Sequence, residues 1–176
     1  MTKNELEDLL NQYETLIYSL CIRLTQNKED AEDLFQDVWL FACEKMTWID
    51  VGKNPKSYLI GKTLLLWKNK KRRFARRNKI APQIQLYDET QNEAAPADCL
   101  QPEEMMLQKE MVACLNKEIQ KLSDKYREVI ELYYSMDLKT SEIADILRIP
   151  QGTVESRLYK ARKLLKEKME ECGYEF

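Results

Sequence analysis

Residues 140–168 read TSEIADILRIPQGTVESRLYKARKLLKEK, a pattern that predicts two helices joined by a tight turn. Ala144 is small enough for close packing, and Ile149 and Val154 are apolar where the two helices would meet. Pro150 suits the first turn of the second helix. The turn and the second helix carry seven Lys or Arg and two acids. This layout favours a helix-turn-helix that offers its second helix to the major groove of DNA, against the alternative of a helical hairpin with a solvated basic face.

Length and composition favour an all-α protein. The 176 residues suffice for one domain or two small ones, and four glycines with few β-branched runs are typical of helical folds. No apolar run is long enough to cross a bilayer, and the acidic start MTKNELEDLL is not a secretory signal. We therefore expect a cytoplasmic protein that does not insert into a membrane. The cysteines match no zinc-ligand spacing and are expected to be reduced thiols: Cys21, Cys43, Cys99, Cys114 and Cys172.

The sequence carries no pattern typical of an enzyme. It has no histidine, which excludes His-based acid–base catalysis, Cys–His nucleophiles and His metal ligands. It has no Gly-rich phosphate loop and no Gly-x-Ser-x-Gly motif. We expect no catalytic residue, no metal, no cofactor and no small-molecule substrate.

Charge is segregated along the chain, although the net charge is only −2. Residues 1–54 hold 5 bases and 11 acids, and residues 55–79 hold 10 bases and no acid. Residues 80–104 hold 6 acids and no base, and residues 105–176 hold 13 of each. The basic block is suited to a polyanion and the acidic block before it to a basic protein surface, because each sign attracts its opposite.

The same segments define the expected organisation: two small helical domains over 1–79 and 105–176, joined by an acidic, proline-containing linker over 80–104. The apolar spacing predicts helices over 3–25, 28–45, 55–78, 103–121, 124–135, 140–147 and 150–171, with Asn27, Asn54 and Ser123 as caps and a loop over 46–53.

The second predicted helix has a polar face suited to docking. Its members stand at i, i+1, i+4 and i+5, so they point the same way. We expect Trp39 to be exposed beside this face, with Phe35 within one turn, because an exposed aromatic among acids is typical of a docking site. A solvated face is the alternative. The polar members are Glu32, Asp33, Gln36 and Asp37.

The basic block interleaves cations with Tyr58, Trp67 and Phe74. Unpaired bases can stack on aromatic rings while Lys and Arg neutralise the phosphates of the strand. The alternative is that Tyr58 and Trp67 belong to the core, and both interpretations stay open for these two. Phe74, with arginines on both sides, is expected to be less buried.

Three stretches resemble bacterial sigma factors of the extracytoplasmic-function (ECF) type, in the sigma-70 family. They are EDAEDLFQDVW at 29–39, NPKSYLIGKTLLLWKNKKRR at 54–73 and LSDKYREVIELYYSMDLKTSEIADILRIPQGTVESRLYKARKLLKEKM at 122–169. The resemblance covers nearly the whole chain outside the linker. It implies a transcription initiation factor that joins core RNA polymerase and directs it to promoters.

The resemblance also implies a division of roles. The domain over 1–79 resembles sigma region 2, whose acidic helix docks on the β′ clamp helices and whose next loop and helix open and read the minus-10 element. The domain over 105–176 resembles region 4, which rests on the β flap and reads the minus-35 element. Such factors are commonly held inactive by an anti-sigma protein. The candidate contacts are Asp33, Gln36, Asp37 and Trp39 for core polymerase; Lys56, Tyr58, Lys62, Trp67, Lys68, Lys70, Lys71, Arg72, Arg73 and Phe74 for the minus-10 element; and Gln151, Thr153, Ser156, Arg157, Lys160, Arg162 and Lys163 for the minus-35 element.

The chain departs from the family pattern at three places. Arg148 stands where the helix-turn-helix usually has Gly, which costs roughly 1 kcal/mol if φ is positive there. Lys139 replaces a capping Ser, so Thr140 is expected to take over the cap. Thr63-Leu64-Leu65 replaces a frequent Ala-Arg-Asn, so base contacts are not carried over there.

Two other functions are compatible with parts of the pattern. The first is a stand-alone helix-turn-helix regulator, which has no need of the acidic helix. The other is an interaction protein that titrates an anti-sigma factor, which has no need of the intact basic block.

Overall fold

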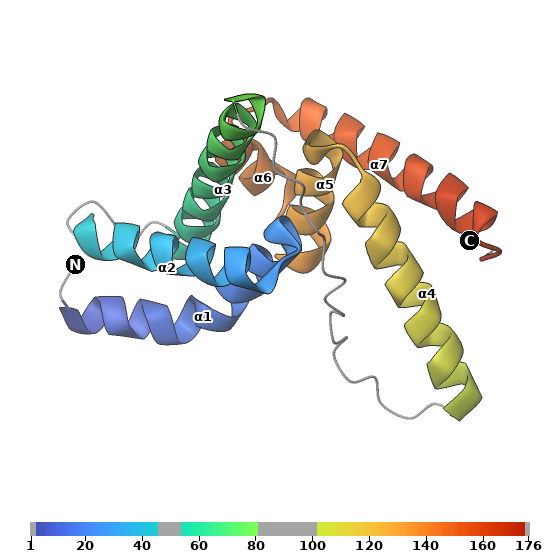
Figure 1. Cartoon of the computed structure of the whole chain (residues 1–176), viewed down its shortest axis with the longest axis horizontal. Helices are drawn as coiled ribbons and strands as arrows, with labels where there is room; N and C mark the ends of the chain where they lie inside the picture. The colour runs from blue at the N-terminus through green and yellow to red at the C-terminus, as the bar shows by residue number, and fades with distance from the viewer. Residues whose placement is uncertain (1–2, 46–53, 81–101, 175–176) are drawn as a thin grey trace. The chain divides into compact units, whose positions relative to one another are not determined.

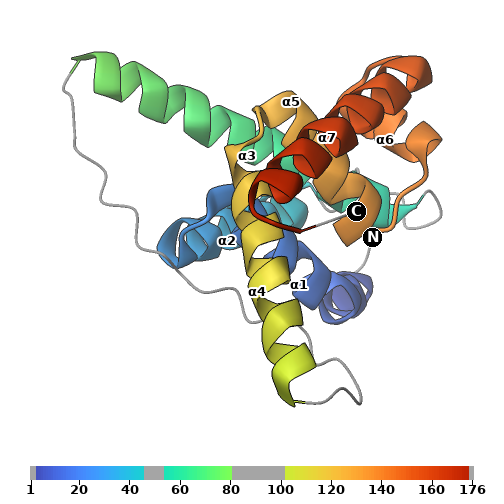
Figure 2. The same ribbon diagram turned by 90° about the vertical axis from the view of Figure 1, so that its right-hand side faces the viewer.

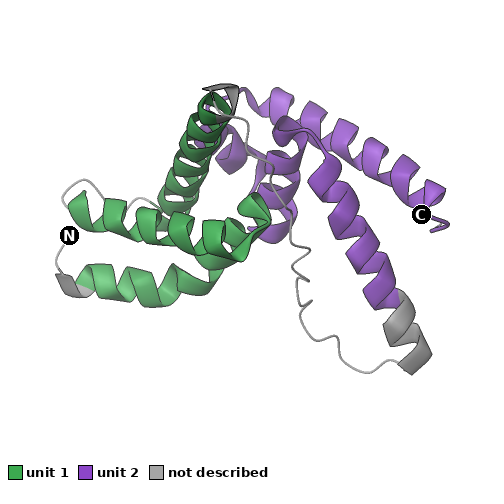
Figure 3. Cartoon of the chain, in the orientation of Figure 1, with its two compact units in different colours: residues 1–90 green, residues 91–176 purple. Residues whose placement is uncertain are grey.

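The computed structural model describes residues 3–45, 54–80 and 102–174, which form seven α-helices and one π-helical turn (Figures 1 and 2). The chain divides into two compact units, residues 1–90 and 91–176 (Figure 3). The division falls inside the segment predicted to be a linker. The all-α prediction is confirmed. The loop predicted over 46–53 and most of the linker lie outside the described residues.

Unit 1 is a three-helix assembly of α1 (Lys3–Thr25), α2 (Lys28–Glu44) and α3 (Pro55–Ile80). Each helix packs on the other two, and their apolar faces form one core. The C-terminal half of α3 extends past α1 and α2 (Figure 2). The largest side chains that are fully buried in this core are Ile17, Leu20, Leu34, Val38, Leu59 and Ile60.

Two asparagines cap the helices of unit 1 as predicted. The side-chain oxygen of Asn27 accepts a hydrogen bond from the Asp30 N–H at 3.2 Å. The side-chain oxygen of Asn54 accepts one from the Ser57 N–H, also at 3.2 Å. Each bond satisfies a donor that the first helical turn leaves without a partner, which is why α2 and α3 begin where they do.

Unit 2 contains α4 (Pro102–Lys121), α5 (Asp124–Ile130), a π-turn (Glu131–Ser135), α6 (Thr140–Leu147) and α7 (Gln151–Glu171). Helix α7 packs against each of the three other α-helices, so it is the central element of the unit. Its buried stripe has the spacing expected of an amphipathic helix. The stripe consists of Val154, Leu158, Ala161, Leu165 and Met169.

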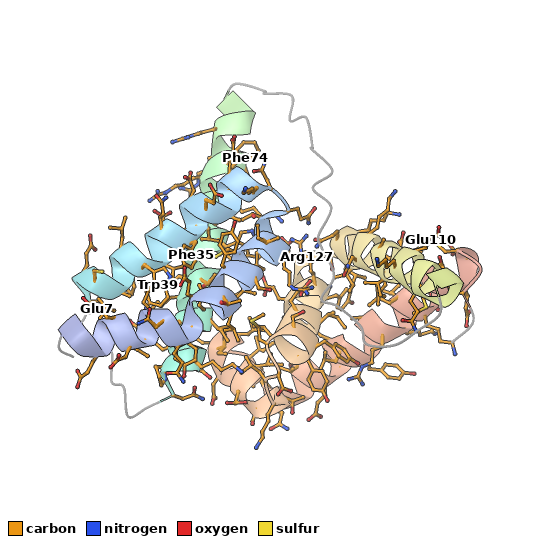
Figure 4. The ribbon with its side chains drawn as sticks, turned by 90° about the horizontal axis from the view of Figure 1, so that it is seen from below. Glu7, Phe35, Trp39, Phe74, Glu110 and Arg127 are labelled. Atoms are coloured by element: carbon orange, nitrogen blue, oxygen red, sulfur yellow. The ribbon has the colours of Figure 1, made fainter. Side chains whose placement is uncertain are left out.

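The start of α5 is not stabilised by the predicted Ser123 cap. Ser123 occupies the cap position, but its side chain makes no capping hydrogen bond. The buried Arg127 (Figure 4) connects the first turn of α5 to the end of α4 instead. Its guanidinium donates to Asp124 Oδ1 at 3.1 Å and to Gln120 Oε1 at 3.2 Å. A buried charge of this kind needs such partners, since isolation from water would destabilise it strongly.

The helix predicted over 124–135 changes character at residue 131. The Met136 N–H donates to the Glu131 carbonyl at 3.1 Å, which is the wider spacing of a π-helix. Glu131 is buried, and its carboxylate accepts a hydrogen bond from the Ser135 hydroxyl at 2.7 Å. The wider turn keeps Leu132 and Met136 in the core and leaves Tyr134 exposed, with the half-buried Tyr133 ring beside it.

The helix-turn-helix has the predicted α6–turn–α7 form, with two local corrections. Pro150 is the cap of α7 and not its first helical residue. Lys139 keeps the cap position of α6, so the expected shift to Thr140 is wrong. The Glu142 carboxylate explains this, because it reaches back and accepts the Lys139 N–H at 2.9 Å.

Arg148 occupies the left-handed conformation that the sequence pattern associates with glycine, at φ 54° and ψ 49°. Its N–H donates to the Ala144 carbonyl, and the Ile149 N–H donates to the same oxygen at 3.1 Å. These bonds end α6 and hold the strained residue in place. The turn therefore keeps the geometry of a glycine turn without the glycine.

Arg148→Gly is expected to stabilise unit 2 by about 1 kcal/mol, because glycine adopts a positive φ without a Cβ clash. The measurement is the free energy of unfolding in urea. Asp145→Gly is the matched control, since it places glycine at an exposed position inside α6 and should destabilise by about 1 kcal/mol. Equal losses in both variants would contradict the strain assigned to Arg148.

Candidate functional site

The polar face of α2 is present as predicted, without the predicted aromatic. Asp33 and Gln36 are exposed, and Asp37 is half-buried. Trp39 is 7% exposed, so the expectation that it lies open beside this face is wrong. The Trp39 ring packs edge-on against Phe35, with 6.1 Å between the ring centres (Figure 4). The Phe35 ring in turn packs edge-on against Tyr18 of α1, with 5.5 Å between the ring centres.

Leu40 is the apolar residue that the acidic face displays. It is 61% exposed, and it stands seven residues after Asp33 and four after Gln36, on the same side of the helix. A leucine in a helical sequence gives no local sign of exposure, so Leu40 is not among the predicted contacts. The exposed face of α2 thus combines carboxylates with one aliphatic side chain.

Asp37 and Lys70 join the two sites that were predicted separately. The Lys70 ammonium lies 2.9 Å from Asp37 Oδ2, and both side chains are about 40% exposed. The pair links the polar face of α2 to the basic half of α3. An ion pair this accessible to water contributes less than about 1 kcal/mol, so either partner can be drawn away by a competing charge.

The aromatic residues of α3 divide between core and surface. Trp67 is 6% exposed and belongs to the core, which supports the structural interpretation for this residue. Tyr58 is half-buried, and burial raises the pKa of its hydroxyl. Phe74 is half-buried on the part of α3 that extends from the bundle (Figure 4).

The predicted cations of α3 differ in what surrounds them. The Lys62 ammonium lies 4.8 Å from the Phe41 ring centre and 5.2 Å from that of Tyr58. The Lys71 ammonium lies 5.3 Å from the Trp67 ring centre. These contacts hold the ammonium groups near aromatic faces. Lys56, Lys62, Lys68 and Lys70 are half-buried, and Lys71, Arg72 and Arg73 are exposed.

The candidate contacts on α7 lie at its N-terminal end and outward face. The Gln151 side-chain amide donates to Thr140 Oγ1 at 3.1 Å and to Glu155 Oε1 at 2.9 Å, so it joins the first turns of α6 and α7. The Ser156 hydroxyl donates to the Thr153 carbonyl at 3.0 Å. Lys160 and Lys163 are exposed, and Arg157 is half-buried.

Arg157 forms no ion pair with any residue in the described parts of the chain, and it shares a face with Thr153 and Lys160. In particular, no ion pair joins Arg157 to Glu155 in these parts of the chain. Tyr159, which is not among the predicted contacts, is 70% exposed on the neighbouring face of the helix.

Arg162 is held by the tyrosines of the π-turn. Its Nε–H donates to the Tyr134 hydroxyl at 2.8 Å, and its guanidinium carbon lies 5.3 Å from the Tyr133 ring centre and 5.5 Å from that of Tyr134. The residue is exposed, yet its orientation is set by these contacts. A preoriented guanidinium loses less conformational entropy when it meets a phosphate.

No helix within the described ranges is long and apolar enough to span a bilayer. The same residues contain no group of three or more Cys, Asp or Glu side chains placed to hold a metal ion.

Comparison with known families finds two matches, one in each unit. Residues 9–77 match the family described as Sigma-70 region 2, and residues 113–165 match Sigma-70, region 4. The ECF RNA polymerase sigma factor SigW of Bacillus subtilis is 30% identical over 166 residues, which are 92% of this chain and 87% of SigW. The RNA polymerase sigma-H factor of Pseudomonas aeruginosa is 24% identical over 93% of this chain and 85% of its own.

Several solved structures share the fold. The sigma factor RpoE of Bartonella quintana, solved with the anti-sigma factor NepR, has a TM-score of 0.77 and 22% identity, with 94% of this chain and 97% of that chain covered. CnrH, solved with the cytosolic domain of CnrY, has a TM-score of 0.63 and 18% identity, with 93% and 86% covered.

Proposed function

The chain belongs to the ECF sigma factors of the sigma-70 family, which direct RNA polymerase to promoters, and we propose that its two units divide that task. Unit 1 docks on core polymerase and binds the minus-10 element, and unit 2 reads the minus-35 element. Sigma factors are not enzymes, so the chain acts through binding alone. The polymerase is its principal partner, which assigns it to the cytoplasm.

The exposed face of α2 is the proposed docking surface for the β′ clamp helices. Asp33 and Gln36 supply charge and hydrogen bonding, and the exposed Leu40 supplies the apolar contact that Trp39 was expected to make. Apolar side chains inside a polar rim are typical of protein interfaces. Trp39 is buried beneath this face, where its ring packs against that of Phe35.

The basic half of α3 is the proposed contact for the minus-10 strand. Arg72 and Arg73 are exposed on a helix that extends from the bundle, where phosphates can reach them. Phe74 is the aromatic best placed to stack on a base, because Trp67 is enclosed in the core. Lys70 becomes available to the strand when a cation of the polymerase replaces it beside Asp37.

The N-terminal half of α7 is the proposed reader of the minus-35 duplex. Residues in this position of a helix-turn-helix face base edges, and those further along meet the backbone. Thr153, Arg157 and Lys160 belong to the first group, and Lys163 to the second. Arg162, which is held by Tyr134, is oriented for a phosphate and not for a base. The β flap is the proposed polymerase contact of this unit.

Arg157→Ala is expected to weaken promoter binding by about 1–3 kcal/mol, which is the discrimination of one bidentate contact to a base. Stability should change little, since Arg157 has no ion pair within the described residues. The measurement compares holoenzymes on promoters altered at each upstream position, with Lys117→Ala as an exposed-cation control on α4. Arg157 has a structural role, and the assignment is wrong, if unit 2 of the variant unfolds while the folded fraction still distinguishes the altered upstream promoter positions as well as the unmodified chain does.

The observation that favours a sigma factor over a stand-alone regulator is the presence of a polar docking face and a helix-turn-helix in one chain. The decisive test is run-off transcription on genomic fragments with purified core polymerase, with and without the chain. Promoter-specific transcripts that require the chain support the proposal. Tight duplex binding by the chain alone, with no change in the transcripts, would support a stand-alone regulator.

An anti-sigma factor is the other proposed partner. The solved neighbour RpoE was captured with the anti-sigma factor NepR, and CnrH was captured with the cytosolic domain of CnrY. A chain that only titrates an anti-sigma factor would bind that protein and fail in the transcription assay. The exposed arginines of α3 argue against this interpretation, because titration has no use for a DNA contact.

A further inference from the structure

The π-turn and α7 together form a tyrosine–arginine cluster on the surface of unit 2. Tyr134 is 58% exposed, and its hydroxyl accepts the hydrogen bond from the Arg162 Nε–H at 2.8 Å. The guanidinium carbon of Arg162 lies over the Tyr133 and Tyr134 rings, at 5.3 and 5.5 Å from their centres. The two rings meet edge-on, with 5.0 Å between their centres. Contacts on two sides therefore fix the orientation of the guanidinium on an open surface.

The π-turn explains why two adjacent tyrosines reach the same arginine. A π-helix has more residues per turn than an α-helix, so consecutive side chains are separated by a smaller angle. The turn itself is anchored, because Leu132 and Met136 are buried and the Ser135 hydroxyl donates to the buried Glu131 carboxylate at 2.7 Å. Tyr134 therefore projects from a fixed backbone. Such turns are rare and are often found at functional sites.

The charge of Arg162 is not neutralised by a carboxylate within the ranges that the structure describes. Its neighbours differ, because the Lys163 and Lys166 ammonium groups lie 3.9 and 3.7 Å from carboxylate oxygens of Glu167 and Glu170. The tyrosine contacts thus hold Arg162 in place and leave its positive charge uncompensated. An anion that approaches the cluster meets a cation that no acid has to release.

The hydrogen-bond donors of the cluster are suited to a phosphate. A guanidinium has five N–H donors, and Tyr134 accepts from one of them. A tyrosine hydroxyl that accepts a hydrogen bond still has its own hydrogen to donate. The bond from Arg162 also polarises the Tyr134 O–H, which makes it a stronger donor. Arginine and tyrosine together therefore present N–H and O–H donors to the oxygens of one anion.

We propose that Tyr134 and Arg162 form a phosphate clamp on the DNA backbone at the minus-35 element, in which Arg162 donates terminal N–H groups and Tyr134 donates its O–H to one phosphate. Arg162 stands eleven residues after Gln151, the first residue of α7, and this part of a recognition helix meets the backbone. The proposal rests on the proposed reading of this duplex by unit 2. It adds Tyr134, a residue outside the helix-turn-helix, to the DNA contacts.

The test measures binding of the holoenzyme to a promoter duplex recovered by run-off transcription, at several salt concentrations. Tyr134→Phe keeps the ring and removes the hydroxyl, so the affinity should fall about threefold to tenfold. The slope of log affinity against log salt should stay the same, because no charge is lost. Arg162→Ala should make that slope shallower by about 0.9. In the Arg162→Ala background, Tyr134→Phe should weaken binding less than about twofold, because the hydroxyl has lost the partner that orients it.

A neutral methylphosphonate, placed at one backbone position of the upstream duplex at a time, identifies the phosphate. At the contacted position, Tyr134→Phe should no longer weaken binding, whereas it should still do so at every other position. A merely structural role of Tyr134 would leave its effect the same at all positions. Tyr126→Phe is the matched control, because it removes the hydroxyl of a half-buried tyrosine on α5 and should bind like the unmodified chain. Circular dichroism of each variant checks that the helices are intact.

Three outcomes would overturn the clamp. The first is a Tyr134→Phe holoenzyme that binds the duplex like the unmodified one, and the second is an equal loss with and without Arg162. The third is weaker binding of Tyr134→Phe to core polymerase with unchanged duplex binding, which would assign the cluster to an acidic group of the polymerase. A failure of the proposed function looks different, because Arg157→Ala would then leave upstream discrimination intact.

Discussion

Replacing Asp33 with lysine is expected to lower the affinity of the chain for core RNA polymerase at least about tenfold, with the fold intact. Asp33 is exposed on α2, so its charge contributes little to folding. At a basic surface such as the one proposed on the clamp helices, the substitution turns an attraction into a repulsion. Like charges brought together at an interface cost several kcal/mol, more than the roughly 1.4 kcal/mol that corresponds to a factor of ten.

The measurement is a binding titration with core polymerase, alongside circular dichroism of the free chain. Glu14→Lys is the matched control, because it makes the same charge change at an exposed position on α1. Asp37 is a poorer choice, because its replacement also releases Lys70 on α3, the helix proposed to contact the minus-10 strand. If Asp33→Lys and Glu14→Lys bind core equally well, α2 is a solvated face and the docking proposal is wrong.

Replacing Arg72 and Arg73 with alanine is expected to flatten the salt dependence of minus-10 strand binding. Each phosphate contact to a single strand releases about 0.7 of a counterion, so the slope of log affinity against log salt should fall by roughly 1.4. Over the range from 1 M to 0.15 M salt, this difference corresponds to roughly tenfold weaker binding at the lower concentration. Both arginines are exposed, so their removal should leave the helices intact.

The assay measures holoenzyme binding to a single-stranded minus-10 oligonucleotide at several salt concentrations. Lys109→Ala with Lys117→Ala is the control, because it removes two exposed cations from α4 and leaves α3 unchanged. The proposal predicts a change of slope for the arginine pair alone. An identical slope for both double variants would mean that the basic half of α3 does not contact the strand.

The local pattern of apolar and capping residues was sufficient to predict where the helices lie. The apolar spacing of α1, and the caps Asn27 and Asn54, placed the helix boundaries of unit 1 within a residue or two of those observed. The left-handed turn at Arg148 could also be anticipated, because the motif around it requires that conformation. These features depend on residues a few positions apart, and short-range hydrogen bonds and side-chain periodicity determine them.

The local sequence pattern could not predict which side chains of α2 are exposed. Helix α2 packs against both α1 and α3, so its buried surface is wider than one apolar stripe. Trp39 falls inside this wider surface, while Leu40 falls outside it. A helical pattern gives the direction in which each side chain points, but the packing of the neighbouring helices determines which directions are covered.

The ion pair and the hydrogen bond that orient charged side chains between helices are long-range. Lys70 meets Asp37 across two helices, and Arg162 meets Tyr134 across the helix-turn-helix. Neither of these pairs has a spacing that marks it in the sequence, because the separation along the chain says nothing of which helices pack together. Sequence alone was therefore enough for the family, the helices and the segregation of charge. Which charged side chains are paired and which remain available to polymerase or DNA depended on packing, since an ion pair or a hydrogen bond forms only where the fold brings its two partners within a few ångströms.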